Sequence, residues 1–154
     1  INSSSNTGVR QIANNTSQFD LFQGCKIEGN TGFQSTTTTA NLVSYNSTFK
    51  GRTSAGIFLG ANIYAFLVEG GEIDGFTDAV NIANGTNRAA NTNNIIKDTL
   101  LYAGSGNIIT EGAYNVADLG VFNLQNNMLN KALVYTVTVV DNGNNSVIVG
   151  LQQF

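Results

Sequence analysis

The acidic residues that could form a catalytic pair recur at a regular interval along the first half of the chain. Glu28, Lys50 and Asp74 each follow a large apolar residue and precede a glycine. Two carboxylates about 6.5–9.5 Å apart can hydrolyse a glycosidic bond with inversion. Strands stacked about 4.8 Å apart would separate Glu28 from Asp74 by about 9–10 Å. The lysine between them favours a ladder of stacked opposite charges over a catalytic pair, and contact with a saccharide is a third interpretation.

A second acidic pair flanks two consecutive glycines. Glu69 and Glu72 enclose Gly70 and Gly71 in the segment VEGGEID. Close carboxylates in such a turn could share a proton or bind calcium, although a solvated turn is the interpretation we favour. Asp141 in DNGNN resembles the start of a calcium loop, but the rest of that pattern is missing. We therefore expect no metal site.

The residues that are absent exclude several classes of chemistry. The chain contains no histidine, which rules out Ser-His-Asp and Cys-His arrangements and histidine-ligated metals within it. Its one cysteine, Cys25, cannot form an internal disulfide. No dinucleotide fingerprint or P-loop occurs, so we expect no cofactor. Arg52, Arg88 and Lys97 form no evident cluster with acids in the sequence, which argues against lyase chemistry.

Five aromatic side chains are candidates for a binding surface, because their strand parity or corner position can point them outward. They are Tyr45, Tyr64, Phe76, Tyr102 and Tyr114. Sugar rings stack on exposed aromatic faces, while Asn, Gln and Thr supply hydrogen bonds. Contact with neighbouring subunits is an equally good interpretation of the same residues.

The composition favours an uncharged, turn-rich β protein. Of 154 residues only 11% are charged, against about a quarter in typical domains, whereas Asn occurs 23 times and Pro is absent. Asn, Gly, Ser and Thr suit turns more than helices. A net charge of −3 provides no basic footprint for nucleic acid. No apolar run approaches the length of a membrane span, so we expect no membrane insertion.

Apolar residues repeat in two columns spaced by 22–28 residues, and a third, looser column with the same spacing also includes Ser44. The first column contains Ile27, Phe49, Ile73 and Leu101. The second contains Val9, Phe33, Ile57, Val80 and Ile108, and the third contains Phe22, Ser44, Val68, Ile96 and Leu124. Residues alternate in polarity around each position, which indicates β-strands. Three short strands per repeat predict an all-β fold, a right-handed parallel β-helix of about four to six rungs. Asn and Gly are expected at its tight corners.

The repeat predicts which residues form rungs and which cap them. We assign residues 1–112 to the rungs, and 113–154 to a last rung with Leu129 and Val134 in the columns, followed by a C-terminal cap. In that cap, 132–140 and 146–154 would pair as a β-hairpin around Asn-Gly. The chain starts in mid-rung, so we expect more β-helix upstream. Cys25 falls in a column of small inward residues and is expected to be a buried thiol.

These Asn-, Gly- and Thr-rich rungs without proline, fading into a strand-rich end, resemble the distal part of bacteriophage tailspikes and similar viral receptor-binding appendages. The resemblance covers roughly residues 7–135 and rests on no short motif, so it assigns no catalytic residue. It implies a homotrimer on the virion surface, outside the cell, that attaches to host surface polysaccharide. The alternatives are a polysaccharide hydrolase or lyase on the same fold, and a monomeric bacterial surface protein related to pectate lyases. Few acids are available for either enzyme.

Overall fold

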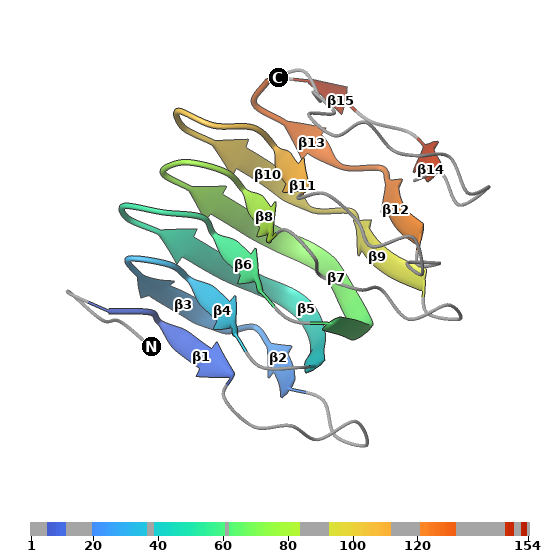
Figure 1. Cartoon of the computed structure of the whole chain (residues 1–154). Coiled ribbons are helices and arrows are strands. Elements are labelled where there is room, and N and C mark those ends of the chain that lie inside the picture. The colour runs from blue at the N-terminus through green and yellow to red at the C-terminus, as the bar shows by residue number, and fades with distance from the viewer. Residues whose placement is uncertain are drawn as a thin grey trace.

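The structure, a computed structural model, is built from β-strands throughout the part of the chain that it describes. It describes residues 6–11, 20–36, 39–60, 62–83, 93–111, 121–131, 147–149 and 152–153. These ranges contain no helix, and hence none that could span a membrane. The strands form two sheets. Each turn of the chain adds strands to both sheets, and these turns of the chain, or levels, stack along the molecule (Figure 1).

The longer sheet has ten described strands and the shorter sheet has five. The longer sheet consists of β2 (Asp20–Gln23), β3 (Lys26–Gly29), β5 (Thr39–Gly51), β7 (Asn62–Gly75), β9 (Asn93–Lys97), β10 (Leu100–Ala103), β12 (Val121–Gln125), β13 (Met128–Leu129), β14 (Val147–Val149) and β15 (Gln152–Gln153). The shorter sheet consists of β1 (Val9–Gln11), β4 (Phe33–Ser35), β6 (Ile57–Leu59), β8 (Val80–Ile82) and β11 (Ile109–Glu111). Their described pairings are all parallel, and each level pairs with the next stretch of the chain. The chain is therefore a parallel β-helix, as the repeat predicted.

A corner divides each level of the longer sheet into two limbs. The first limb contains β2, β9, β12 and the first halves of β5 and β7; the second contains β3, β10, β13 and the second halves of β5 and β7. The corner residues have positive φ angles, and they are Gly24 (60°), Asn46 (50°), Gly70 (69°), Asp98 (51°) and Asn126 (51°). Only Gly, Asn and Asp adopt this left-handed conformation at low cost. The expectation of Asn and Gly at tight corners is confirmed for this column.

Two of the three predicted columns are confirmed residue by residue. Ile27 pairs with Phe49, Ile73 lies next, and Leu101 and Leu129 complete the first column along the second limb. The third column, on the first limb, joins the five predicted residues in register from β2 to β12. The described members of the first column are buried, because alternate residues of each strand point into the space that the two sheets enclose.

The second column is confirmed from Val9 to Val80 but was wrong by one residue at its end. Val80 pairs with Ile109, whereas the sequence predicted Ile108. The turn between β10 and β11 is one residue longer than the turn between β7 and β8, which shifts the register. Ile108 is nevertheless fully buried, so both isoleucines contribute to the core.

Cys25 is exposed, so the prediction of a buried thiol was wrong. It follows β2, and β2 and β3 are the first described level of the longer sheet. Its column neighbour Ser47, one level further along, is completely buried. The backbone N–H of Cys25 donates to Ser47 Oγ at 3.1 Å, so the column exists, but its terminal member has only one described level against it.

The C-terminal segment contributes further rung strands. β14 pairs in parallel with β12, and β15 pairs in parallel with β13. The second strand of the predicted hairpin thus continues the stack of the longer sheet (Figure 1). The proposed partner strand 132–140, its turn and Val134 lie outside the described residues.

Candidate functional site

One outward-facing column of the second limb carries most of the polar residues that the sequence singled out. Glu28 pairs with Lys50, Lys50 with Asp74, and Asp74 with Tyr102 along β3, β5, β7 and β10. Each lies next to a buried residue of the first core column and therefore points away from the core. The column presents acid, base, acid and phenol in successive levels.

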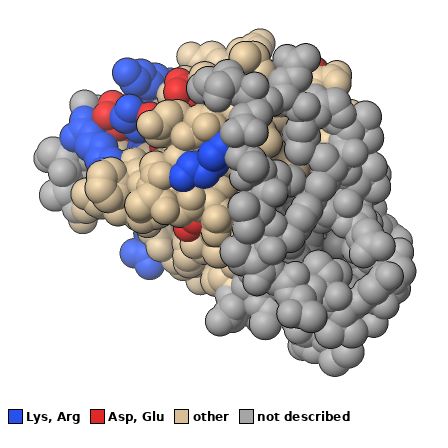
Figure 2. Space-filling view, turned by 90° about the horizontal axis from the view of Figure 1, so that it is seen from above, with Lys and Arg blue, Asp and Glu red and all other residues tan. Residues whose placement is uncertain are grey.

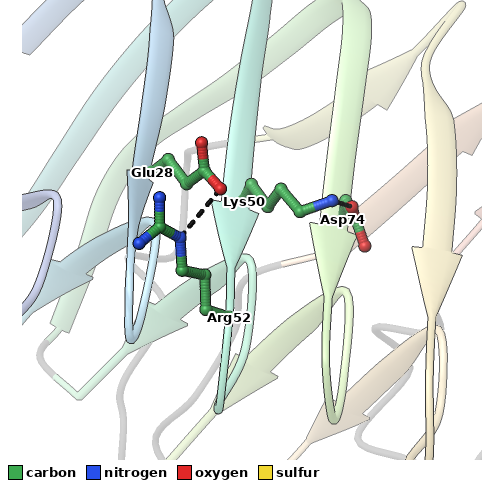
Figure 3. A network of polar contacts seen from close by, with 4 residues as sticks. All are labelled: Glu28, Lys50, Arg52 and Asp74. Atoms are coloured by element: carbon green, nitrogen blue, oxygen red, sulfur yellow. Dashed lines mark hydrogen bonds and ion pairs between the residues drawn. The ribbon is translucent and has the colours of Figure 1, made fainter. Parts of the chain in front are cut away.

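The charges of this column form two ion pairs (Figure 3). Lys50 Nζ lies 2.6 Å from Asp74 Oδ2, and Arg52 Nε lies 2.9 Å from Glu28 Oε1. Arg52 comes from the turn after β5. The predicted charge ladder thus forms between Lys50 and Asp74, whereas Glu28 takes its hydrogen bond from a turn residue outside the column.

Of the three basic residues that form no cluster with acids in the sequence, two each form an ion pair with an acid in the structure. Arg52 pairs with Glu28, and Lys97 Nζ lies 3.0 Å from Glu69 Oε1. Each partner lies one level away, and therefore far away in the sequence, because stacked levels bring together residues a full repeat apart. Arg88 lies outside the described residues.

The ion pairs shift the pKa of two residues of this column, Glu28 and Lys50. The Arg52 hydrogen bond holds the pKa of Glu28 below its ordinary value, and the hydrogen bond to Asp74 raises the pKa of Lys50. A general acid in a glycosidase needs a carboxyl whose pKa is raised. The lowered pKa of Glu28 suits a carboxylate that stays ionised at neutral pH, and together with its ion pair to Arg52 this favours a structural role over that of a general acid in a catalytic pair with Asp74.

Protonation of Glu28 in acid should lower the free energy of unfolding. Because the pKa of Glu28 is lower in the folded than in the unfolded chain, its contribution is fully present above the ordinary value of 4.5 and is lost as pH falls through the folded value. Urea unfolding between about pH 6 and about pH 3 measures this. The variant Glu28→Gln should show a shallower acid loss, and a curve parallel to that of the wild type would contradict the assignment.

The second acidic pair does not form a shared site. Glu69 lies on the first limb and pairs with Lys97, whereas Glu72 lies on the second limb in register with Thr48 and Leu100. The two glycines between them are the corner itself, with φ of 69° and 83°. Within the described ranges, no group of three or more acidic or cysteine side chains is placed to hold a metal ion. Asp141 lies outside those ranges.

A hollow of about 450 Å³ opens where the second limb meets the turns that follow it. Its lining residues are Lys50, Gly51, Arg52, Asp74, Gly75, Phe76, Tyr102, Gly104 and Ser105. Phe76 is 59% exposed and Tyr102 is 43% exposed. This volume lies in the range of small-ligand pockets, about 300–1,000 Å³.

The hollow exists because a glycine follows Phe76 in the stack of turns. The backbone N–H of Arg52, Phe76 and Gly104 each donates to the last residue of the strand one level earlier. These three residues therefore occupy equivalent positions in successive levels. Gly104 has no side chain to lie beside the Phe76 ring, and a Cβ there would collide with the Phe76 carbonyl. The ring consequently remains open to solvent.

Of the five candidate aromatics, two line the hollow, one lies on the first limb, and the side chains of two fall outside the described residues. Phe76 and Tyr102 are the two that line the hollow. Tyr45 is half-buried on the first limb, in register with Glu69. Tyr64 belongs to β7, but its side chain is outside the described part of the structure, as is the whole of Tyr114. Sequence reasoning missed Arg52 and Ser105 as lining residues, because turn residues follow no fixed periodicity.

The outer face of the first limb carries an apolar ridge. Leu21, Val43, Leu67 and Ile95 follow one another in register on β2, β5, β7 and β9. Leu21 is 56% exposed, and the other three are half-buried. A continuous outward apolar column is unusual on a protein surface that water covers. In the view of Figure 2, Lys, Arg and acidic side chains of the described residues cluster at the upper left, and a few more charged side chains lie at the centre and along the edges.

No protein-family model, curated protein or solved structure matches the chain.

Proposed function

We propose that the chain is an attachment module that binds a cell-surface polysaccharide in the hollow beside Phe76 and Tyr102. The observation that carries this is the pairing of two exposed aromatic side chains with charged hydrogen-bonding groups in one concave site. Pyranose rings present apolar C–H faces to aromatic rings and hydroxyl groups to polar side chains. The supporting strands are parallel and stacked, so the site is held rigidly before a ligand arrives.

Attachment without turnover is favoured over hydrolysis. Glu28 and Asp74 lie two levels apart, and each is held by a cation. A hydrolase would release reducing ends from a bound polysaccharide, and Glu28→Gln or Asp74→Asn would abolish that release. Binding that leaves the polymer intact would support the attachment module.

The setting we propose is a bacteriophage tailspike or similar viral receptor-binding appendage, at the virion surface and outside the cell. Stacked Asn- and Gly-cornered rungs are the basis of that resemblance, which is one of fold. A host-cell polysaccharide is the partner it implies.

The apolar ridge of Leu21, Val43, Leu67 and Ile95 supports a homotrimer. Such a column loses its contact with water when copies of the chain pack on it. Light scattering on a sizing column measures the solution mass, and we expect three times the 16.3 kDa of one chain. A mass of one chain would contradict the trimer without affecting the saccharide site.

Removal of either aromatic side chain should weaken glycan binding. We expect Phe76→Ala and Tyr102→Ala each to lower affinity about tenfold, since a stacking contact contributes on the order of 1–1.5 kcal/mol. The measurement is a glycan-array screen followed by calorimetry on the glycans that bind. Met128→Ala is the matched control, because Met128 is 47% exposed but does not line the hollow. Equal losses in all three variants would contradict this site.

A further inference from the structure

The cations of the hollow are more accessible than the carboxylates that pair with them. The side chain of Lys50 is 43% exposed and that of Asp74 is 15% exposed. Arg52 is 35% exposed against 17% for Glu28. A ligand that enters the hollow therefore meets the cations first, and each carboxylate is largely covered.

This positive character is a local property. The whole chain carries a net charge of −3 and has only 7 Lys and Arg residues, of which two line this one hollow. Lys50 Nζ has three N–H donors, and the hydrogen bond to Asp74 uses one. Its remaining donors can reach an acceptor in the hollow without breaking the ion pair.

The aromatic rings lie on the other side of the same site. Tyr102 occupies the level after Asp74 in the outward column, where another charge would continue the ladder. Phe76 lies in the turn that follows Asp74 by two residues. The hollow thus joins a cationic end, formed by Lys50 and Arg52, to an aromatic end. A ligand that satisfies both ends has an apolar ring face and a negative charge on the same unit.

We propose that the hollow selects a sugar unit that carries a carboxylate, such as a uronate, with the carboxylate at Lys50 and Arg52 and the ring against Phe76 and Tyr102. This inference rests on the proposed saccharide function and names the class of sugar. Hydrogen bonds between cationic donors and a carboxylate are about twice as strong as neutral ones, so the charge provides the selectivity.

The test compares carboxylated oligosaccharides with their own neutral forms. The probes are a panel of uronate-containing oligosaccharides, among them one of alternating glucuronate and N-acetylglucosamine. Each is measured by calorimetry beside the same molecule after its carboxyl groups are reduced to hydroxymethyl groups. We expect the wild type to bind the carboxylated form at least about tenfold more tightly, with the advantage shrinking as salt is raised.

The variants Lys50→Gln and Arg52→Gln should each remove most of this difference. Lys97→Gln is the matched control, because Lys97 also pairs with a glutamate but lies on the first limb. The glutamine amide can still donate a hydrogen bond to the covered carboxylate, so these variants are expected to fold.

Two results would overturn the inference. One is equal affinity for the carboxylated and reduced forms, and the other is no binding to any carboxylated member of the panel. In the first case the proposed function survives if Phe76→Ala still weakens binding. If oligosaccharides bind but neither aromatic variant weakens them, the proposed site itself fails, whatever the charge preference.

Discussion

Gly75→Ala should destabilise the chain by about 3 kcal/mol or more. A Cβ at Gly75 would overlap the backbone carbonyl of Asp78, and it would also lie 3.0 Å from the backbone nitrogen of Gly56. Neither backbone can move aside easily, because the turn that contains Asp78 is fixed to the next level. The Asp78 carboxylate accepts hydrogen bonds from Asn107 N at 2.8 Å, Thr110 Oγ1 at 2.7 Å and Asn81 Nδ2 at 2.9 Å.

Urea unfolding followed by far-UV circular dichroism measures this loss. The control is Ala103→Gly at the equivalent position one level later, where Ala103 pairs in register with Gly75. Removing that buried methyl should lower the free energy of unfolding by about 1–2 kcal/mol, through the more flexible glycine backbone and the lost apolar contact. If Gly75→Ala destabilised no more than Ala103→Gly, the close approach of the turn to the strand would be refuted.

Asn127→Ala should lower the free energy of unfolding by about 3 kcal/mol. Asn127 is completely buried at the corner between β12 and β13, where its side-chain amide bonds to the backbone of the previous level. Its Oδ1 accepts from the backbone N–H of Thr99 at 3.1 Å, and its Nδ2 donates to the carbonyl of Ile96 at 2.9 Å. Alanine would leave both backbone groups buried without these bonds, and a buried polar group without a partner costs about 1–3 kcal/mol.

The matched control for this variant is the neighbouring residue. Asn126 is exposed and has a φ of 51°, which glycine adopts freely. Asn126→Gly should therefore change the unfolding midpoint little. Equal effects at the two positions would show that the buried amide is not what connects the levels.

The sequence was sufficient to predict the fold because the core residues repeat with little variation. The large apolar residues of the first column point inward, and the residues on either side of each point outward. Aligning the inward residues therefore determines the strand register, which pairs Ile27, Phe49, Ile73 and Leu101 in succession. The alternation of charge after them likewise predicted the Lys50–Asp74 pair. Side chains alternate between the two faces of a strand in every level, so the same pattern of inward residues recurs in the sequence.

Turn residues could not be predicted in the same way. Turn lengths differ between levels, which is why Ile109 rather than Ile108 pairs with Val80. The same variation in turn length made the ion pair between Arg52 and Glu28 of the previous level impossible to predict. The hollow itself depends on Gly104 following Phe76 in the stack, a relation visible only once the turns are superimposed. Cys25 was placed correctly in its column, but burial depends on the neighbouring levels as well as on parity.

A saccharide bound between the second limb and its turns would contact the residues that line the hollow. The most direct measurement is an NMR titration of the isotope-labelled chain with the alternating glucuronate and N-acetylglucosamine oligosaccharide. We expect the largest shifts on the signals of the lining residues Lys50, Arg52, Phe76, Tyr102 and Ser105, with the corner and first-limb signals unchanged. Shifts confined to the first limb, at Leu21, Tyr45 and Leu67, would contradict binding in the hollow and place the binding surface on the apolar ridge.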